Sequence, residues 1–460
     1  MREGVAGGAR ATRTIGHVPT GDRCGARPGV WQNEPVRSRA SGRPSLGLLL
    51  GLAVVVAACG SAVQSLGTPS TTSAPSPLAS ASSSLDSEQA IFAEIEAQVE
   101  AIRGLHASTT VTPVLLDSNG MRDWLTNANA QQTDHQALAN QSRLLIHLGL
   151  LPAGSSLEQL ELALLAAQAV GVYDTVSKGM YVLSTSGGVG PLVRETFAHE
   201  YTHALQDQGF GLDKLATGTP DQGDRDLART ALPEGDATLV MYEWAGKYLS
   251  AADQIEIAND PANQAAADQL ARAPAILRHT LLFPYYDGLA FVRGIYRKGG
   301  WAAVNQMYAN PPDSTSQIIH PELYAAQVRP IAVALPAVPA SLGSGWTLAM
   351  ADTLGEFQLR ILLQGETPSD AVTTASMSAT SAWGGDRVGM YEGPDGAWAV
   401  VLRTDWRTDA GAAAFQSAMA SKSGQLPGAA VVCADGQEVA LYVASDVTAL
   451  EAFATCRPPL

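Results

Sequence analysis

Cysteine is scarce in this sequence, with four residues in 460. Cys24 and Cys59 lie in the N-terminal segment, so only Cys433 and Cys456 remain for the folded part of the chain. In an oxidising compartment this pair predicts one disulfide, and the alternative is two free buried thiols. A structural zinc site is not expected from the pair alone, because such sites use four ligands.

Positive charge is also scarce, because 29 Lys and Arg stand against 44 Asp and Glu, a formal net charge of −15. Residues 1–43 contain eight Arg and three acids and so contribute +5. The rest of the chain therefore carries −15 − 5 = −20. A surface this acidic argues against nucleic acid or anionic lipid as a binding partner.

The apolar run near the N-terminus is too short to span a membrane comfortably, because a spanning helix needs about 20 apolar residues. It covers residues 46–58, follows Arg37, Arg39 and Arg43, and ends in small residues. This arrangement is typical of an export signal. Val56-Ala57-Ala58-Cys59 resembles a bacterial lipobox, which implies a lipid on Cys59 and anchoring to the outer face of the cell membrane. The alternative is a plain signal peptide.

Composition divides the chain into four parts. Residues 1–58 are an N-terminal extension and lipoprotein signal peptide, and 59–86 are a tether rich in Ser, Thr and Pro. Residues 87–345 show mostly helical periodicity with a few short strands. Residues 346–460 alternate strands and helices as a small α+β unit. The predicted fold class is α+β and mostly helical, with two cores.

The motif His199-Glu200-x-x-His203 lies in a stretch without Pro or Gly from residue 192 to 208, which predicts a helix. Residues four apart project from one face of a helix, so both imidazoles can bind one zinc ion. Glu200 is then placed beside a metal-bound water as a general base. The alternative is an amphipathic helix with two solvated histidines.

A third protein ligand is required, and Gly209 occupies the position of a further histidine six residues beyond the motif. Glu234 is the next candidate, because Pro233 and Glu234 are expected to open a helix that faces the motif. The alternative is an acid favoured by the helix dipole. Glu243 is a weaker candidate ligand.

His199-Glu200-x-Thr202-His203, with Asp207 one turn later, resembles the zinc helix of the gluzincin metallopeptidases, of which thermolysin is the best known. The resemblance covers mainly residues 170–250 and implies a zincin-like domain over residues 87–345. It implies zinc held by His199, His203 and Glu234, with Glu200 as base and Asp207 orienting an imidazole. The whole chain also resembles a group of exported bacterial lipoproteins that carry this motif.

Three further segments are candidates for the same site. Met180–Ser184 is a candidate edge strand for pairing with an extended substrate, and the alternative is an ordinary sheet strand. Phe283–Gly288 is expected to break a long helix and line a cleft. Gluzincins often bind the oxyanion through a distal His or Tyr, which makes His320 a candidate, with a helix-end histidine as the alternative. Tyr324 is a weaker candidate for that role.

These observations predict a membrane-anchored, extracytoplasmic zinc metallopeptidase whose partner is a peptide or protein substrate. A non-catalytic lipoprotein that acts in binding, adhesion or scaffolding is the alternative, although a dead site has no need of Glu200. A hydrolase of non-peptide amides also stays open. The sequence gives neither the substrate nor the oligomeric state.

Overall fold

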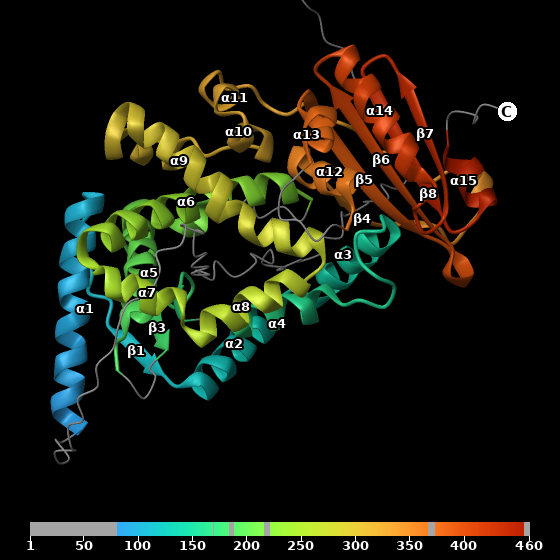
Figure 1. The fold of residues 1–460 in the computed structure, drawn as a ribbon. Coiled ribbons are helices and arrows are strands. Elements are labelled where there is room, and N and C mark those ends of the chain that lie inside the picture. The colour runs from blue at the N-terminus through green and yellow to red at the C-terminus, as the bar shows by residue number, and fades with distance from the viewer. Residues whose placement is uncertain (1–80, 169, 184–187, 216–220, 367–372, 455–460) are drawn as a thin grey trace, which may run out of the picture. The chain divides into compact units, whose positions relative to one another are not determined.

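The computed structural model describes residues 81–168, 170–183, 188–215, 221–366 and 373–454 (Figure 1). The predicted export signal, Cys59 and Cys456 lie outside these residues. Within them the fold is α+β and mostly helical, with two sheets, as the sequence predicts. No described helix is both long enough and apolar enough to cross a lipid bilayer.

The first sheet precedes the motif helix in the chain and has the strand order β1-β3-β2. Its strands are β1 (Pro113–Leu116), β2 (Gly171–Asp174) and β3 (Gly179–Leu183). Strand β3 pairs in parallel with β1 and antiparallel with β2. The prediction that Met180–Ser184 forms an edge strand is therefore wrong, because β3 is central, and Ser184 lies outside the described residues. Strand β2 is an edge strand instead.

Helices pack around this sheet and make up most of the described residues before residue 326 (Figure 1). Several begin at a side chain that accepts a hydrogen bond from the helix backbone, such as Asp117, Asp134 and Ser250. The helices are α1 (Ala81–Arg103), α2 (Ser118–Gln132), α3 (His135–His147), α4 (Leu157–Gln168), α5 (Pro191–Phe210), α6 (Gly223–Tyr248), α7 (Ala251–Ala258), α8 (Pro261–Arg272), α9 (Ala275–Ala309), α10 (Thr315–Ile319) and α11 (Pro321–Ala325), with a 3-10 turn η1 at Leu212–Lys214.

Helices α6 and α9 pack so closely that their backbones are in contact at Gly235 and Gly288. A Cβ atom added to Gly235 would lie 2.3 Å from the backbone of Gly288, which leaves no room for a side chain. Helix α6 runs through Pro233, and α9 runs through Pro284, so neither proline begins or breaks a helix as the sequence suggested. The interruption of α9 lies at Gly300, where φ is 62°. Packing between the two helices outweighs the local effect of both prolines.

A buried ion pair joins α1 to α6. Arg103 donates from Nε to Asp236 Oδ1 at 2.8 Å and from Nη2 to Asp236 Oδ2 at 2.9 Å, and neither side chain is exposed. Tyr308 of α9 donates its hydroxyl to the same carboxylate at 2.7 Å. Removing one partner would leave a buried charge unpaired, at a cost of about 3–5 kcal/mol. This network therefore fixes α6 two residues beyond Glu234.

The second sheet is antiparallel, with the strand order β4-β5-β6-β8-β7. Alternate residues of β6 face different cores: Val400 and Leu402 join the main core, whereas Ala399 and Val401 join a smaller core that includes Phe453 of α15. The elements are β4 (Thr347–Asp352), α12 (Gly355–Gln364), α13 (Thr374–Thr380), β5 (Trp383–Glu392), β6 (Trp398–Trp406), α14 (Asp409–Ser423), β7 (Ala429–Asp435), β8 (Glu438–Ala444) and α15 (Val447–Phe453), with 3-10 turns η2 (Ala340–Leu342) and η3 (Pro394–Gly396). Cys433 is disulfide-bonded, and its predicted partner Cys456 lies outside the described residues.

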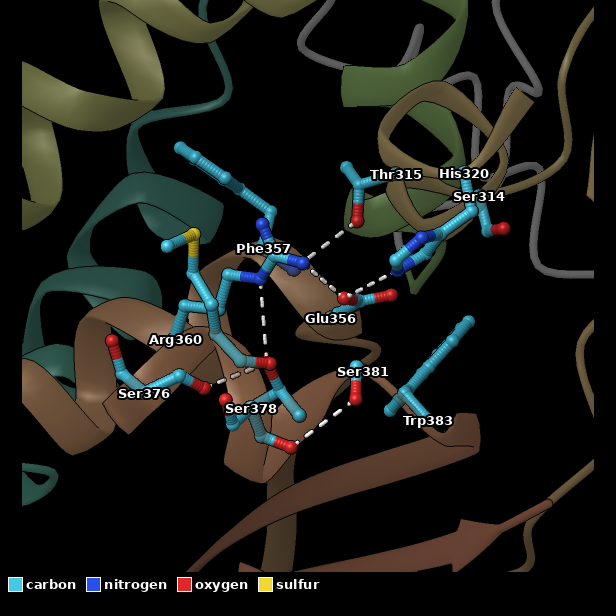
Figure 2. Close-up of polar contacts among 12 residues, drawn as sticks. Ser314, Thr315, His320, Glu356, Phe357, Arg360, Ser376, Ser378, Ser381 and Trp383 are labelled. Atoms are coloured by element: carbon cyan, nitrogen blue, oxygen red, sulfur yellow. Dashed lines mark hydrogen bonds and ion pairs between the residues drawn. The ribbon is translucent and has the colours of Figure 1, made fainter. Parts of the chain in front are cut away.

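Buried polar side chains join this sheet to the helices that precede it. Asp386 of β5 accepts hydrogen bonds from the backbone N–H groups of Leu354 and Gly355 at the start of α12. Asp224 of α6 accepts from the N–H and the hydroxyl of Thr315 at 3.1 and 2.5 Å. Figure 2 shows the neighbouring contact of Thr315 with the backbone of Phe357. The second sheet is therefore tied to the beginning of α6.

We expect Asp224→Asn to stabilise the protein at pH 8 and to have little effect near pH 4. Burial, and to a lesser extent the nearby Asp386 charge, raises the pKa of Asp224 to about 8 in the fold. Between the ordinary pKa of an aspartate and pH 8, the unfolded chain releases this proton while the folded chain keeps it, so the wild type loses stability as the pH rises through that range. Asparagine keeps an acceptor for Thr315 and carries no charge. Thermal melts should show a gain of about 3 °C at pH 8.

The matched control is Asp226→Asn in the same turn of α6, where the side chain is only half-buried. It should show no comparable gain at pH 8. A melting temperature of Asp224→Asn that follows the wild type at both pH values would show that the Asp224 charge does not oppose folding.

Candidate metal centre

Helix α5 carries the motif and is buried on almost every side. Pro191 occupies its first turn, where the missing N–H costs no hydrogen bond, and Gly211 ends it with φ 74°. All residues from 195 to 207 are buried. The polar side of the helix is buried as well, because it faces α6 and β2. The two histidines are therefore not solvated.

The side chains of His199, His203 and Glu234 converge between α5 and α6. The two imidazole Nε2 atoms lie 3.1 Å apart. Glu234 Oε2 lies 3.2 Å from Nε2 of His199 and 3.4 Å from Nε2 of His203. At most 3% of any of the three side chains is exposed. Among the described residues, these three form a group of potential ligand atoms that lie within 4.8 Å of one another.

The distances fit a metal ion. In a tetrahedral zinc site with bonds of about 2.0–2.1 Å, neighbouring ligand atoms are about 3.3 Å apart. The three separations, from 3.1 to 3.4 Å, agree with that value. The sequence-predicted ligands are thus brought together, although Glu234 lies in the middle of a 26-residue helix and not at its start.

The protonation of the three residues is coupled. Burial would raise the pKa of Glu234, but the nearby His203 charge and hydrogen bonds with both imidazoles outweigh it and hold that pKa below its usual range. Burial would lower the pKa of His203, but Glu234 raises it. Burial lowers the pKa of His199. Because a metal binds a neutral imidazole, the raised pKa of His203 sets protonation in competition with cation binding.

Gln206 connects His203 of α5 to Pro233 of α6, the residue that precedes Glu234. Its Oε1 lies 2.8 Å from Nδ1 of His203, and its Nε2 donates to the carbonyl of Pro233 at 3.0 Å. An amide oxygen is an acceptor, so this contact places the hydrogen of His203 on Nδ1 and leaves Nε2 for a metal. The sequence resemblance implied Asp207 for this role, but the described hydrogen bonds of Asp207 go to other residues. Gln206 is the residue that contacts the imidazole.

Glu200 is held by the backbone of β2. The N–H of Tyr173 donates to Glu200 Oε2 at 2.8 Å. Glu200 Oε1 is buried and has no hydrogen-bond partner among the described residues. Burial raises the pKa of Glu200 to about 8. The two oxygens therefore differ: Oε2 is fixed by the strand, and Oε1 is available to another molecule.

The remaining candidates are not in this group. His320 Nε2 lies 2.9 Å from Glu356 Oε1, and Figure 2 shows both beside Arg360. The structure thus pairs His320 with the buried acid of α12, and not with the three converging side chains. Tyr324 donates to the carbonyl of Asn310. Glu243 is not one of the three either. The ring of Tyr285 is the aromatic ring near His199, with centroids 6.1 Å apart.

Comparison with known proteins gives two matches. Residues 347–454 match a domain of unknown function, DUF8575. No curated protein matches the chain. A crystal structure from Chloroflexus aurantiacus, described as a "putative hydrolase with a novel fold", is 18% identical over 55% of this chain and 92% of that one, with a TM-score of 0.35. A TM-score of this size does not establish a common fold.

We expect Gln206→Leu to weaken metal binding by about 10–100-fold, the usual cost of losing a partner that orients a metal-binding histidine. Leucine fills a similar volume but offers His203 no acceptor and Pro233 no donor. Competition with a chelator of known affinity measures the loss. Gln208→Leu is the control, because Gln208 lies on the same helix but bonds to Ser108 and Thr109. Equal losses in both variants would contradict the assigned role of Gln206.

Proposed function

We propose that the protein is a zinc-dependent hydrolase, specifically a gluzincin-type metallopeptidase that acts outside the cytoplasm. The observation that supports this most is the triangle of His199 Nε2, His203 Nε2 and Glu234 Oε2, with sides of 3.1, 3.2 and 3.4 Å. Two imidazoles and a carboxylate suit zinc, whereas calcium and magnesium favour oxygen ligands. A site with three protein ligands leaves one tetrahedral position for water or substrate.

The chain's own residues supply the other parts of a hydrolytic reaction. A bound zinc ion would act as the Lewis acid that activates water and polarises the substrate carbonyl. Glu200 accepts the proton of the attacking water on Oε1 and returns it to the leaving nitrogen, so that the amide is cleaved to an acid and an amine. The N–H of Tyr173 holds Oε2 during both transfers.

The edge strand β2 supports a peptide substrate. Leu183 N–H donates to Val170 O, which makes Val172 and Tyr181 the next hydrogen-bonded pair of the ladder. Gly171 and Tyr173 therefore direct their backbone groups away from β3. The Tyr173 N–H is already bonded to Glu200, so an extended peptide backbone would pair with the Gly171 groups and the Tyr173 carbonyl. This strand takes the role that the sequence suggested for Met180–Ser184.

The N-terminal sequence supports a lipid-anchored location on the outer face of the cell membrane. The apolar run over residues 46–58 and the four residues that end in Cys59 are the basis for it. A tether rich in Ser, Thr and Pro follows and separates the anchor from α1. The proposed partners are a peptide or protein substrate and the membrane through the lipid.

We expect the purified protein to contain one zinc ion per chain by elemental analysis. Glu200→Gln should keep the zinc, because Glu200 is not a ligand, and should lower the cleavage of a pooled peptide library by about 10²–10⁴-fold. His203→Ala should lose both zinc and cleavage. Mass spectrometry of the peptide products measures the rates.

Two outcomes would contradict this proposal. Protein without stoichiometric zinc, and without uptake of added zinc, would favour the non-catalytic lipoprotein. Cleavage of the library that survives Glu200→Gln unchanged would show that Glu200 is not the base. Zinc with no cleavage of any peptide, but with hydrolysis of other amides, would restrict the proposal to a hydrolase.

We expect Cys59→Ala to move the protein from the membrane fraction to the soluble fraction of cells that express the full chain. Loss of the thiol removes the lipid attachment. The apolar run over residues 46–58 is too short to hold the protein in the membrane by itself. Labelling with a radioactive fatty acid should mark the wild type only. Label on Cys59→Ala would contradict the lipobox interpretation.

A further inference from the structure

The β2–β3 hairpin, residues 171–183, contacts helix α5 at two positions that are seven residues apart. The backbone N–H of Tyr173 donates to Glu200 at 2.8 Å. The hydroxyl of the same Tyr173 donates to Asp207 Oδ2 at 2.9 Å. Tyr173 therefore bonds to α5 twice: its main chain bonds to Glu200, and its side chain bonds to Asp207 about two turns further along the helix.

Asp207 accepts hydrogen bonds from strand β2 and from the turn of the hairpin. Besides the Tyr173 hydroxyl, its Oδ2 accepts from Lys178 Nζ at 2.6 Å. Lys178 lies in the hairpin turn with φ 58°, in the left-handed region. Asp207 Oδ1 accepts from the N–H of Leu212 at 3.0 Å, which fixes the carboxylate at the end of α5. Asp207 is buried, whereas about half of the Lys178 side chain is exposed.

Strand β2 also packs closely against α5 beside Glu200. A Cβ atom on Gly171 would lie 2.9 Å from Thr196 Cγ2 and 3.3 Å from Glu200 Cγ. Gly171 thus contacts the aliphatic part of the Glu200 side chain, and Tyr173 donates to the Glu200 carboxylate. Any movement of β2 along the helix would move the Tyr173 N–H relative to Glu200 Oε2.

We propose that Tyr173 and Asp207 are positioning residues for the base. Asp207 holds the Tyr173 side chain, the side chain holds β2, and the Tyr173 N–H fixes Glu200 Oε2 so that Oε1 faces the attacking water. Asp207 thereby acts on the base and not on an imidazole. This inference rests on the proposed hydrolase function.

The test combines Tyr173→Phe with Glu200→Gln. Tyr173→Phe keeps the ring and the N–H but loses the bond to Asp207. On the peptide library it should lower kcat about tenfold, with KM within about twofold and one zinc ion per chain. In the Glu200→Gln background the same change should lower the residual rate by less than about twofold, because the base is already lost. Asp207→Leu, which offers the Tyr173 hydroxyl no acceptor, should behave as Tyr173→Phe does.

The matched control is Tyr181→Phe, a tyrosine of β3 whose ring packs on Trp124 away from the base. It should leave kcat within about twofold of the wild type. A purely structural role of Tyr173 would lower kcat equally in both backgrounds or lower the zinc content, and either result would overturn the inference. If Glu200→Gln alone leaves the rate unchanged, the proposed function fails first.

A second measurement needs no substrate. Hydrogen exchange followed by mass spectrometry reports the protection of the amide at position 173. Tyr173→Phe and Glu200→Ala should each speed its exchange about tenfold or more, while the amides of β3 that pair with β1 stay protected. Unchanged protection at position 173 in Tyr173→Phe would show that the Asp207 contact does not hold the strand on Glu200.

Discussion

The contact between α5 and α6 at His199, His203 and Glu234 is the interaction on which the rest of the structure depends. Three polar atoms that are almost completely buried lie within 3.4 Å of one another, at a place where apolar side chains would ordinarily meet. Such a group is costly unless it is paired, protonated or bound to a cation. The surrounding elements supply what it needs: Gln206 from the same helix, the Pro233 carbonyl from α6, and β2 beside Glu200.

Position along α6 is set from outside the site. Gly235 follows the third ligand directly and meets the backbone of Gly288 in α9. One residue further on, Asp236 receives Arg103 and Tyr308. At its start, α6 is joined to the second sheet through Asp224 and Thr315. Contacts from α1, α9 and α10 thus hold α6 on both sides of Glu234, although the helix contains Pro233.

The sequence was sufficient for those parts of the site that depend on local spacing. The four-residue interval of His199 and His203 predicts two imidazoles on one face, and Glu234 is the acid that meets them. Gln206 was missed, although its position three residues after His203 is the interval at which helix side chains touch. Tyr173 acts through its main chain, which carries no sequence signal. His320 lies in no spacing motif, so the sequence did not reveal that its partner is Glu356 of α12.

Long-range pairing accounts for the errors in the fold. Strand β3 looks like an edge in sequence because its neighbour β1 lies more than sixty residues earlier. Pro233 and Pro284 are typical of helix ends, but close packing of α6 on α9 keeps both inside continuous helices. Residues 347–352 form strand β4, because β5 offers them a partner that periodicity does not reveal.

The near-complete burial of the three ligands has a consequence for how an ion enters and leaves. With at most 3% of each side chain exposed, solvent has little access to them while α5, α6 and β2 stay in place. Exchange of a bound cation is then limited by the opening of these elements and not by the strength of its bonds alone. The proposed peptide substrate would need the same opening, so the rate at which these elements separate would limit both metal loading and cleavage.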